Sequence, residues 1–122
     1  MKTILIAEDF QTSRKVIVNT LTRHGYKTLE AADGAEALEY FDGRNIDLLV
    51  TDYNMPNMDG AQLVEQVRKI ETYKYMPVLV LSTEINQNKR DRAQAAQITG
   101  WISKPFDLER FLKIIEKSLK NS

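Results

Sequence analysis

The sequence has no cysteine and no excess of either charge. The absence of cysteine excludes disulfides, thiolate zinc sites and thiol catalysis. Lys and Arg together number 17, as do Asp and Glu, so global charge does not favour nucleic acid or a membrane surface as a partner. Any electrostatic function must therefore arise from a local arrangement of charges.

Long hydrophobic runs are also lacking. The apolar stretch near the N-terminus reaches Glu8 and Asp9 before it is long enough for a signal peptide or a membrane span. We therefore expect a cytoplasmic protein without membrane insertion. A length of 122 residues with 43% apolar content predicts one compact domain over residues 1–122.

Short apolar runs alternate with segments of helical period. The runs cover residues 3–7, 27–31, 47–51, 78–81 and 101–103 and predict strands, several of them continuous enough for a sheet covered on both faces. Between and after them lie apolar stripes with the spacing of amphipathic helices. The stripes comprise Val16, Ile17, Thr20 and Leu21; Ala37, Leu38 and Phe41; Leu63, Val64, Val67 and Ile70; and Leu108, Phe111, Leu112, Ile115 and Leu119.

The segment 86–97 is also predicted to be helical, but it offers the core little more than alanine. A helix with so few apolar contacts is expected to be weakly anchored, which suits an element that shifts. The regular alternation of strand and helix predicts a doubly wound α/β fold with right-handed crossovers. Ligands of such sheets bind beyond the carboxyl ends of the strands, so residues that follow each strand are the functional candidates.

Three carboxylates follow two of the predicted strands. Glu8 and Asp9 come after the first strand, and Asp52 comes after the third. Such a cluster repels itself, and hard oxygen ligands of this kind suit Mg²⁺. Alternatively, Glu8 and Asp9 are polar residues at a loop start, with Asp9 capping the next helix.

Asp52 leaves an apolar strand and enters a turn. Beside a cation it can stay ionised, and an ionised carboxylate is a competent nucleophile toward phosphorus. Asn54, two residues later, can offer its backbone carbonyl to the same cation. The alternative is that Asp52 is a turn-forming residue, as Asp often is before Pro and Gly.

A hydroxyl and an ammonium group follow the last two strands. Thr83 comes after the fourth strand and Lys104 after the fifth. A hydroxyl donor, a lysine charge and Mg²⁺ together provide the positioning and charge neutralisation that phosphoryl transfer needs. Taken singly, Thr83 could cap a helix and Lys104 could be a solvated charge.

Taken together, these motifs make the chain resemble the receiver domain of bacterial response regulators over essentially its whole length. The spacing of the motifs matches that family. They are Ile4-Leu5-Ile6-Ala7-Glu8-Asp9, Thr51-Asp52-Tyr53-Asn54-Met55-Pro56-Asn57-Met58-Asp59-Gly60, Leu81-Ser82-Thr83 and Lys104-Pro105-Phe106.

The resemblance implies a function for each of the site residues. Asp52 would accept a phosphoryl group from a histidine kinase, and Mg²⁺ would be held by Glu8, Asp9, Asp52 and the backbone carbonyl of Asn54. Thr83 would sense the phosphoryl group.

The resemblance also implies that Lys104 binds the phosphoryl group and that the Lys104–Pro105 peptide bond is cis. The fold it implies is flavodoxin-like: a five-stranded parallel sheet of order 2-1-3-4-5 with helices on both faces.

Two positions depart from the commonest family pattern. Trp101 stands where receivers usually have a switch Tyr or Phe, so it is either a switch residue with an altered readout or a core or interface aromatic. Glu84 follows Thr83 where a small residue is frequent, and it is expected to narrow access to the phosphoryl site.

The residues around Glu84 and 99–102 further resemble stand-alone chemotaxis regulators. Output is then expected through protein contacts made by residues 86–97, Trp101 and the last helix, with the flagellar motor switch as target.

A phosphorelay receiver and a pseudo-receiver that only binds partners are the alternatives. An aspartate-nucleophile phosphatase is disfavoured because Asn54 replaces its second acid, and a flavin carrier because Glu8 and Asp9 would repel the flavin phosphate.

Overall fold

The computed structural model describes residues 1–83 and 86–120, in which strands and helices alternate along the chain. The strands are β1 (Thr3–Ala7), β2 (Lys27–Ala31), β3 (Leu48–Asp52), β4 (Val78–Ser82) and β5 (Gly100–Ser103). The helices are α1 (Gln11–Arg23), α2 (Gly34–Glu39), α3 (Gly60–Arg68), the short 3₁₀ helix η1 (Glu71–Tyr73), α4 (Gln87–Ala95) and α5 (Leu108–Lys120).

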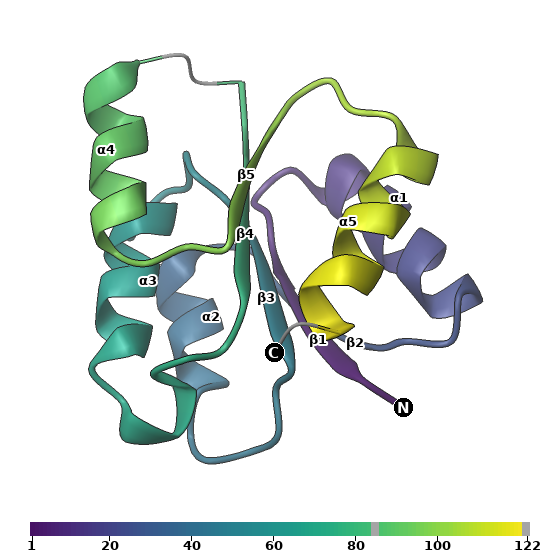
Figure 1. Ribbon diagram of the computed structural model, residues 1–122, viewed down its shortest axis with the longest axis horizontal. Helices are drawn as coiled ribbons and strands as arrows, with labels where there is room; N and C mark the ends of the chain where they lie inside the picture. Colours follow the sequence, from purple (N-terminus) through teal and green to yellow (C-terminus); the bar gives the residue numbers. More distant parts are fainter. Residues whose placement is uncertain (84–85, 121–122) are drawn as a thin grey trace.

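The five strands form one parallel sheet in the order β2-β1-β3-β4-β5, which confirms the predicted fold. Helices α1 and α5 cover one face of the sheet, and α2, α3 and α4 cover the other (Figure 1). Strands β1, β3 and β4 are buried along their whole length because both of their faces are covered. No helix among the described residues is long and apolar enough to cross a membrane.

Alternate residues of each central strand enter different cores. Ile4 and Ile6 of β1 pack with α1 and α5, together with the buried Phe111 and Ile115. Leu5, between them, belongs to the core under α2 and α3. This alternation is the two-residue period of a strand, and it holds the sheet rigidly between two apolar layers.

The third strand begins and ends one residue later than predicted. Asp47 precedes it and accepts a hydrogen bond from the Thr3 backbone N–H at 2.8 Å, so Asp47 secures the entry to the strand and does not belong to it. Asp52 is the last residue of β3, where its backbone pairs with Leu81 of β4. The sheet therefore fixes the backbone from which the Asp52 carboxylate extends.

Two residues of the predicted apolar stripes are exposed. Val16 is 47% exposed and Leu108 is 37% exposed, although both were expected to face the core. The two side chains line an open cleft between α1 and the start of α5, beyond the end of the sheet. Helical spacing correctly placed Val16 and Leu108 on the apolar faces of α1 and α5. It could not show that these two positions lie beyond the end of the sheet, where no strand covers them.

Helix α4 is held mainly by polar contacts. Ala93 is its only buried residue in the described part of the chain. Arg92 pairs instead with Glu65 of α3 at 2.9 Å, and Arg68 of α3 donates to the Gln97 carbonyl just beyond α4 at 2.7 Å. The predicted lack of apolar anchoring is confirmed, and charged groups supply the contacts to α3.

Candidate functional site

Three acidic side chains meet at the carboxyl edge of the sheet. Glu8 directly follows β1, and Asp52 ends the neighbouring β3, where Ala7 lies beside Thr51. One carboxylate oxygen from each of Glu8, Asp9 and Asp52 lies within 4.8 Å of the other two. The predicted convergence of the acids is confirmed, and Glu8 is only 2% exposed.

The Lys104 ammonium group lies between two of these carboxylates. Its Nζ is 2.9 Å from Glu8 Oε2 and 3.0 Å from Asp52 Oδ2. Lys104 follows β5, and its backbone N–H donates to the Ser82 carbonyl at the end of β4. The Lys104–Pro105 peptide bond is cis, as the resemblance implied. Lys104 therefore reaches across the end of β4 to join groups from β1 and β3.

Burial and pairing act against each other in this cluster. Burial raises the pKa of Glu8, the nearby Asp52 carboxylate raises it further, and Lys104 offsets only part of the rise. Burial alone would lower the pKa of Lys104, but the hydrogen bonds that its ammonium group donates to Glu8 and Asp52 outweigh burial and raise that pKa above its usual value. The charged form of Lys104 is therefore stabilised, whereas the charged form of Glu8 is disfavoured.

Backbone contacts define the position of the acidic loop. The Glu8 N–H donates to the Ala31 carbonyl of β2 at 3.0 Å, and the Phe10 N–H donates to Glu8 Oε1 at 3.2 Å. Phe10, and not Asp9, is the N-cap residue of α1, and it makes no side-chain capping bond. The alternative role of Asp9 as a helix cap is therefore wrong, and its exposed carboxylate faces the acidic cluster.

The turn after Asp52 is built by residues other than Asp52. Asp59 caps α3 in a reciprocal pair with Gln62. The Gly60 N–H donates to the Tyr53 carbonyl at 2.7 Å, and a Cβ on Gly60 would lie 2.4 Å from the Asp52 carbonyl oxygen. Glycine thus lets α3 begin directly against the end of β3. Asn54 is exposed in this turn, and its part as a metal ligand stays a prediction.

Thr83 and Lys104 line the same open cleft, which has a volume of about 580 Å³. Thr83 is exposed directly after β4, so the structure brings the predicted hydroxyl and ammonium groups to one place. The rest of the cleft is mostly apolar and includes Val16, Ile17 and Leu108. Glu84 lies outside the described residues.

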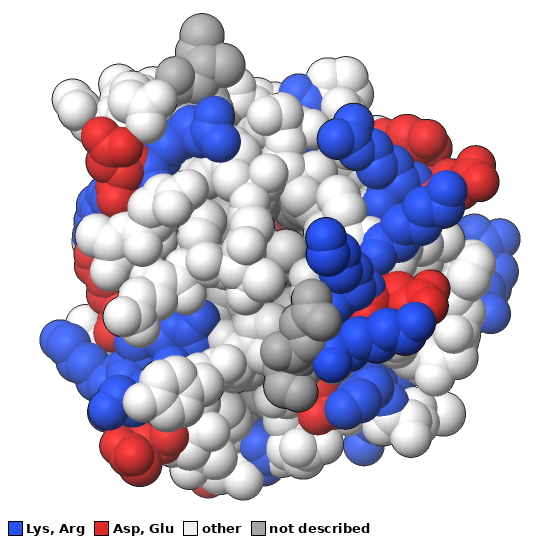
Figure 2. All heavy atoms as spheres, viewed as in Figure 1, with Lys and Arg blue, Asp and Glu red and all other residues white. Residues whose placement is uncertain are grey.

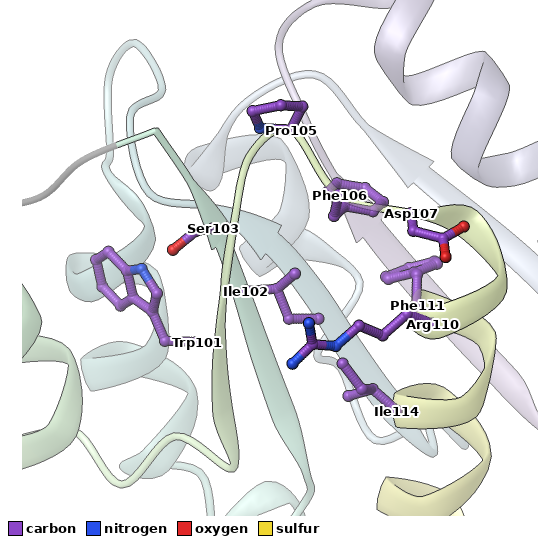
Figure 3. A pocket seen from close by; sticks show the side chains of 9 residues that line it. All are labelled: Trp101, Ile102, Ser103, Pro105, Phe106, Asp107, Arg110, Phe111 and Ile114. Carbon is purple, nitrogen blue, oxygen red and sulfur yellow. The ribbon is translucent and has the colours of Figure 1, made fainter.

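Trp101 points to the α4 side of β5, whereas its neighbour Ile102 points toward α5 (Figure 3). The indole packs against the Tyr53 ring at a centroid distance of 5.7 Å, and the Arg90 guanidinium lies 5.3 Å from the indole centre. Indole Nε1 is buried and has no hydrogen-bond partner within residues 1–83 and 86–120. Tyr53 directly follows Asp52, so its side chain connects Trp101 with the acidic site.

Sequence reasoning missed two contributors to this region. Tyr53 was given no role of its own within the motif after Asp52, yet its ring contacts Trp101 and so connects the end of β3 with β5. Arg14 was not among the sequence candidates, yet its Nη1 donates to the Glu8 carbonyl at 2.8 Å. Neither contact has a local sequence signal, since each joins segments that only the fold brings together.

A doubly wound α/β sheet that carries acids, a hydroxyl and a lysine at its carboxyl edge defines a CheY-like class of protein. Residues 4–116 match the model of the response regulator receiver domain. The chain belongs to this family, whose members act in two-component signalling.

Similar proteins include chemotaxis regulators. The chemotaxis protein CheY of Pseudomonas aeruginosa is 41% identical over 115 residues, which cover 93% of each chain. The solved structure of the chemotaxis response regulator CheY4 of Vibrio cholerae has a TM-score of 0.90 at 36% identity and covers 97% of this chain and 98% of that one.

A third similar protein is the receiver domain of a sensor histidine kinase from Pseudomonas aeruginosa. It was solved with a magnesium ion coordinated in its active site cleft. Its TM-score is 0.90 at 24% identity, with 98% of each chain covered, which shows a shared fold.

The raised pKa of Glu8 predicts how a neutral variant will behave. A group with a raised pKa in the folded state adds most to stability at low pH, and that contribution is lost as the pH rises through the folded pKa. Glu8→Gln should therefore raise the free energy of unfolding at pH 7, and the gain should shrink as the pH falls toward the usual Glu pKa.

Urea unfolding in chelator-treated buffer between pH 4 and 8 measures this difference. The exposed Glu39→Gln on α2 is the control and should change stability by less than about 0.5 kcal/mol. A Glu8→Gln protein that is less stable than the wild type at pH 7 would contradict the raised pKa of Glu8 in the folded protein.

Proposed function

We propose that this protein accepts a phosphoryl group on Asp52 from a histidine kinase in a Mg²⁺-dependent reaction, and thereby changes its contacts with a protein partner. The observation that carries the proposal is the Asp52 carboxylate, which lies 3.0 Å from Lys104 Nζ at the edge of the sheet. The protein acts as a signalling module and catalyses only its own phosphorylation and dephosphorylation.

The donor set fits magnesium. Three carboxylates from two neighbouring strand ends offer oxygens within 4.8 Å of one another, and magnesium prefers such hard ligands. Glu8, Asp9, Asp52 and the Asn54 backbone carbonyl are the residues that would hold the ion. When bound, it neutralises oxygen charge on the acids and on the incoming phosphoryl group.

The transfer step follows from the position of Asp52. A bond forms from an Asp52 carboxylate oxygen to phosphorus while the bond from phosphorus to the donor histidine nitrogen breaks. The donor ring leaves as neutral imidazole because its other nitrogen already carries a proton. Attack of water on phosphorus later restores the carboxylate and releases inorganic phosphate.

Lys104 and Thr83 are placed to recognise the new group. Lys104 already contacts Asp52 Oδ2, so a short movement of its ammonium would pair it with a phosphoryl oxygen. Thr83 lines the same cleft and can donate its hydroxyl to a second oxygen. Helix α4, which follows Thr83 in the chain, has only Ala93 buried among its described residues, so a change at Thr83 would meet little resistance from α4.

Exposed apolar residues beside the cleft support docking of the kinase there. Val16 and Leu108 are exposed and border the cleft with Lys104, and Phe10, which is 61% exposed, directly precedes α1. An exposed apolar patch next to a reactive group is typical of a protein contact site. The phosphohistidine would approach Asp52 across this patch, between α1 and α5.

The output surface in this proposal includes Trp101, α4 and α5. Figure 2 shows a largely uncharged surface between α4 and α5, with Lys and Arg along its α5 side. A hollow of about 410 Å³ lies between β5 and α5 on that surface, and the Arg110 side chain extends across it (Figure 3).

The similarity to chemotaxis proteins favours the flagellar motor switch as target, with a phosphorelay protein as the alternative. A cytoplasmic location belongs to the same proposal, because the kinase draws on ATP.

Replacement of Asp52 tests the chemistry directly. Asp52→Asn should abolish Mg²⁺-dependent labelling by acetyl phosphate or by a phosphorylated histidine kinase, because the amide is not a competent nucleophile. The exposed Asp91→Asn on α4 is the matched control and should label like the wild type. Full labelling of the Asp52→Asn protein would exclude Asp52 as the phosphoacceptor, and unchanged labelling in chelator would exclude the metal requirement.

A charge in the apolar patch separates docking from chemistry. Leu108→Asp should lower the rate of transfer from the kinase at least about tenfold, the effect of 1.4 kcal/mol, because docking would bury the new carboxylate. Labelling by acetyl phosphate should change much less. Tyr75→Asp alters another exposed apolar residue, 84% exposed before β4, and should leave both rates unchanged. Equal rates from the kinase for all three proteins would remove the docking surface from the proposal.

The output contact is tested by comparison of two states. Beryllofluoride with Mg²⁺ should increase retention of the motor switch protein on the immobilised chain, and Asp52→Asn should prevent the increase. The chain has one tryptophan, so the fluorescence of Trp101 should change in parallel if its contacts with Tyr53 and Arg90 change. Retention of a phosphorelay protein instead would favour the alternative, and identical partners in both states would contradict a switch.

A further inference from the structure

The Glu8 carbonyl is held by a side chain from outside the acidic cluster. Arg14, in the first turns of α1, donates from Nη1 to this carbonyl at 2.8 Å. The Arg14 side chain is only 14% exposed, so the bond is largely shielded from water. A charged donor on a shielded carbonyl makes one of the stronger hydrogen bonds in proteins.

This bond acts on Asp9 through the peptide plane. The Glu8 carbonyl and the Asp9 N–H belong to one peptide unit, which is planar and rigid. Rotation of that unit would move both the Asp9 Cα and the oxygen that Asp9 presents to the cluster. Asp9 is exposed at the edge of the sheet, so its backbone largely determines where its carboxylate lies.

Arg14 is itself fixed from the other side. Its Nε donates to Glu30 Oε1 at 3.1 Å, and Lys15 Nζ contacts the other oxygen of Glu30 at 3.0 Å. Glu30 lies in β2 beside Ile6 of β1, so it is built into the rigid sheet. The planar guanidinium therefore connects a strand carboxylate to the carbonyl of the acidic loop, which a single ammonium could not do as well.

We infer that Arg14 is a positioning residue for the metal site, which acts through the Glu8–Asp9 peptide and is fixed by Glu30. The inference rests on the proposed Mg²⁺ site and adds to it a residue that touches neither metal nor phosphoryl group. Residues that orient ligands in this way typically change metal affinity by 10- to 100-fold when they are replaced.

The obvious alternative is that Arg14 only braces α1 against the sheet. Lys15 provides the comparison, because it pairs with the same Glu30 carboxylate from the same helix but does not make the Glu8 contact. Its side chain is 51% exposed, and exposed ion pairs contribute little to stability. A brace would show its effect in stability, whereas a positioning residue shows its effect in metal affinity.

The test is a titration of the ¹⁵N-labelled protein with MgCl₂, followed by the amide signals of residues 8–10 and 52–54. Arg14→Gln should weaken Mg²⁺ binding about tenfold and shift the Asp9 amide signal before any metal is added. Arg14→Lys should bind Mg²⁺ more tightly than Arg14→Gln but less tightly than the wild type, since one ammonium group cannot donate to Glu30 and to the Glu8 carbonyl as the guanidinium does. Lys15→Gln should bind Mg²⁺ as the wild type does.

Urea unfolding of the same proteins completes the experiment. Wild-type affinity for Mg²⁺ in Arg14→Gln, with or without a loss of stability, would overturn the inference while the proposed metal site stands. Equal loss of affinity in Arg14→Gln and Lys15→Gln would overturn it too, because the effect would then belong to the Glu30 ion pairs. A wild-type protein without Mg²⁺-dependent shifts would overturn the proposed metal site, and the inference with it.

Discussion

The Lys104 ammonium group lies between the carboxylates of Glu8 and Asp52, and the rest of the site depends on this contact. Without a cation, two nearly buried acids would repel each other across neighbouring strand ends. The contact requires the carboxyl ends of β1, β3 and β5 to reach one edge of the sheet. Parallel pairing in the observed strand order provides this, so the topology is a condition of the chemistry.

The two faces of the sheet support different parts of the proposed function. On the face with α1 and α5, exposed apolar residues surround the cleft that Thr83 and Lys104 line. On the other face, Tyr53 connects the end of β3 with Trp101, and α4 is held mainly by charged contacts to α3. The rigid sheet thus holds the Asp52 carboxylate between two faces. The α1 and α5 face is the proposed docking side, and on the other face the contacts of α4 can rearrange at a small cost in free energy.

Much of the fold and the candidate site could be predicted from the sequence. Continuous apolar strands and helical stripes identified the layers, and the positions after the strands identified Glu8, Asp52, Thr83 and Lys104, because parallel sheets collect such positions at one edge. The exact limits of β3 could not be predicted, since the contact of Asp47 with the Thr3 backbone and the pairing of Asp52 with Leu81 join segments that are distant in the chain. The exposure of Val16 and Leu108 was missed because periodicity describes the face of a helix and not where the sheet beneath it ends.

The sequence by itself determined which chemical groups arrive at the site, because strand and helix periods are local and the residues that follow each strand can be read from them. Only the tertiary structure decided how those groups are paired. Lys104 and Glu8 are 96 residues apart in the chain, and Arg14 and Glu30 are 16 apart. Hydrogen bonds between such segments leave no periodic pattern in the sequence, since they depend on strand order, helix placement and the direction of single side chains.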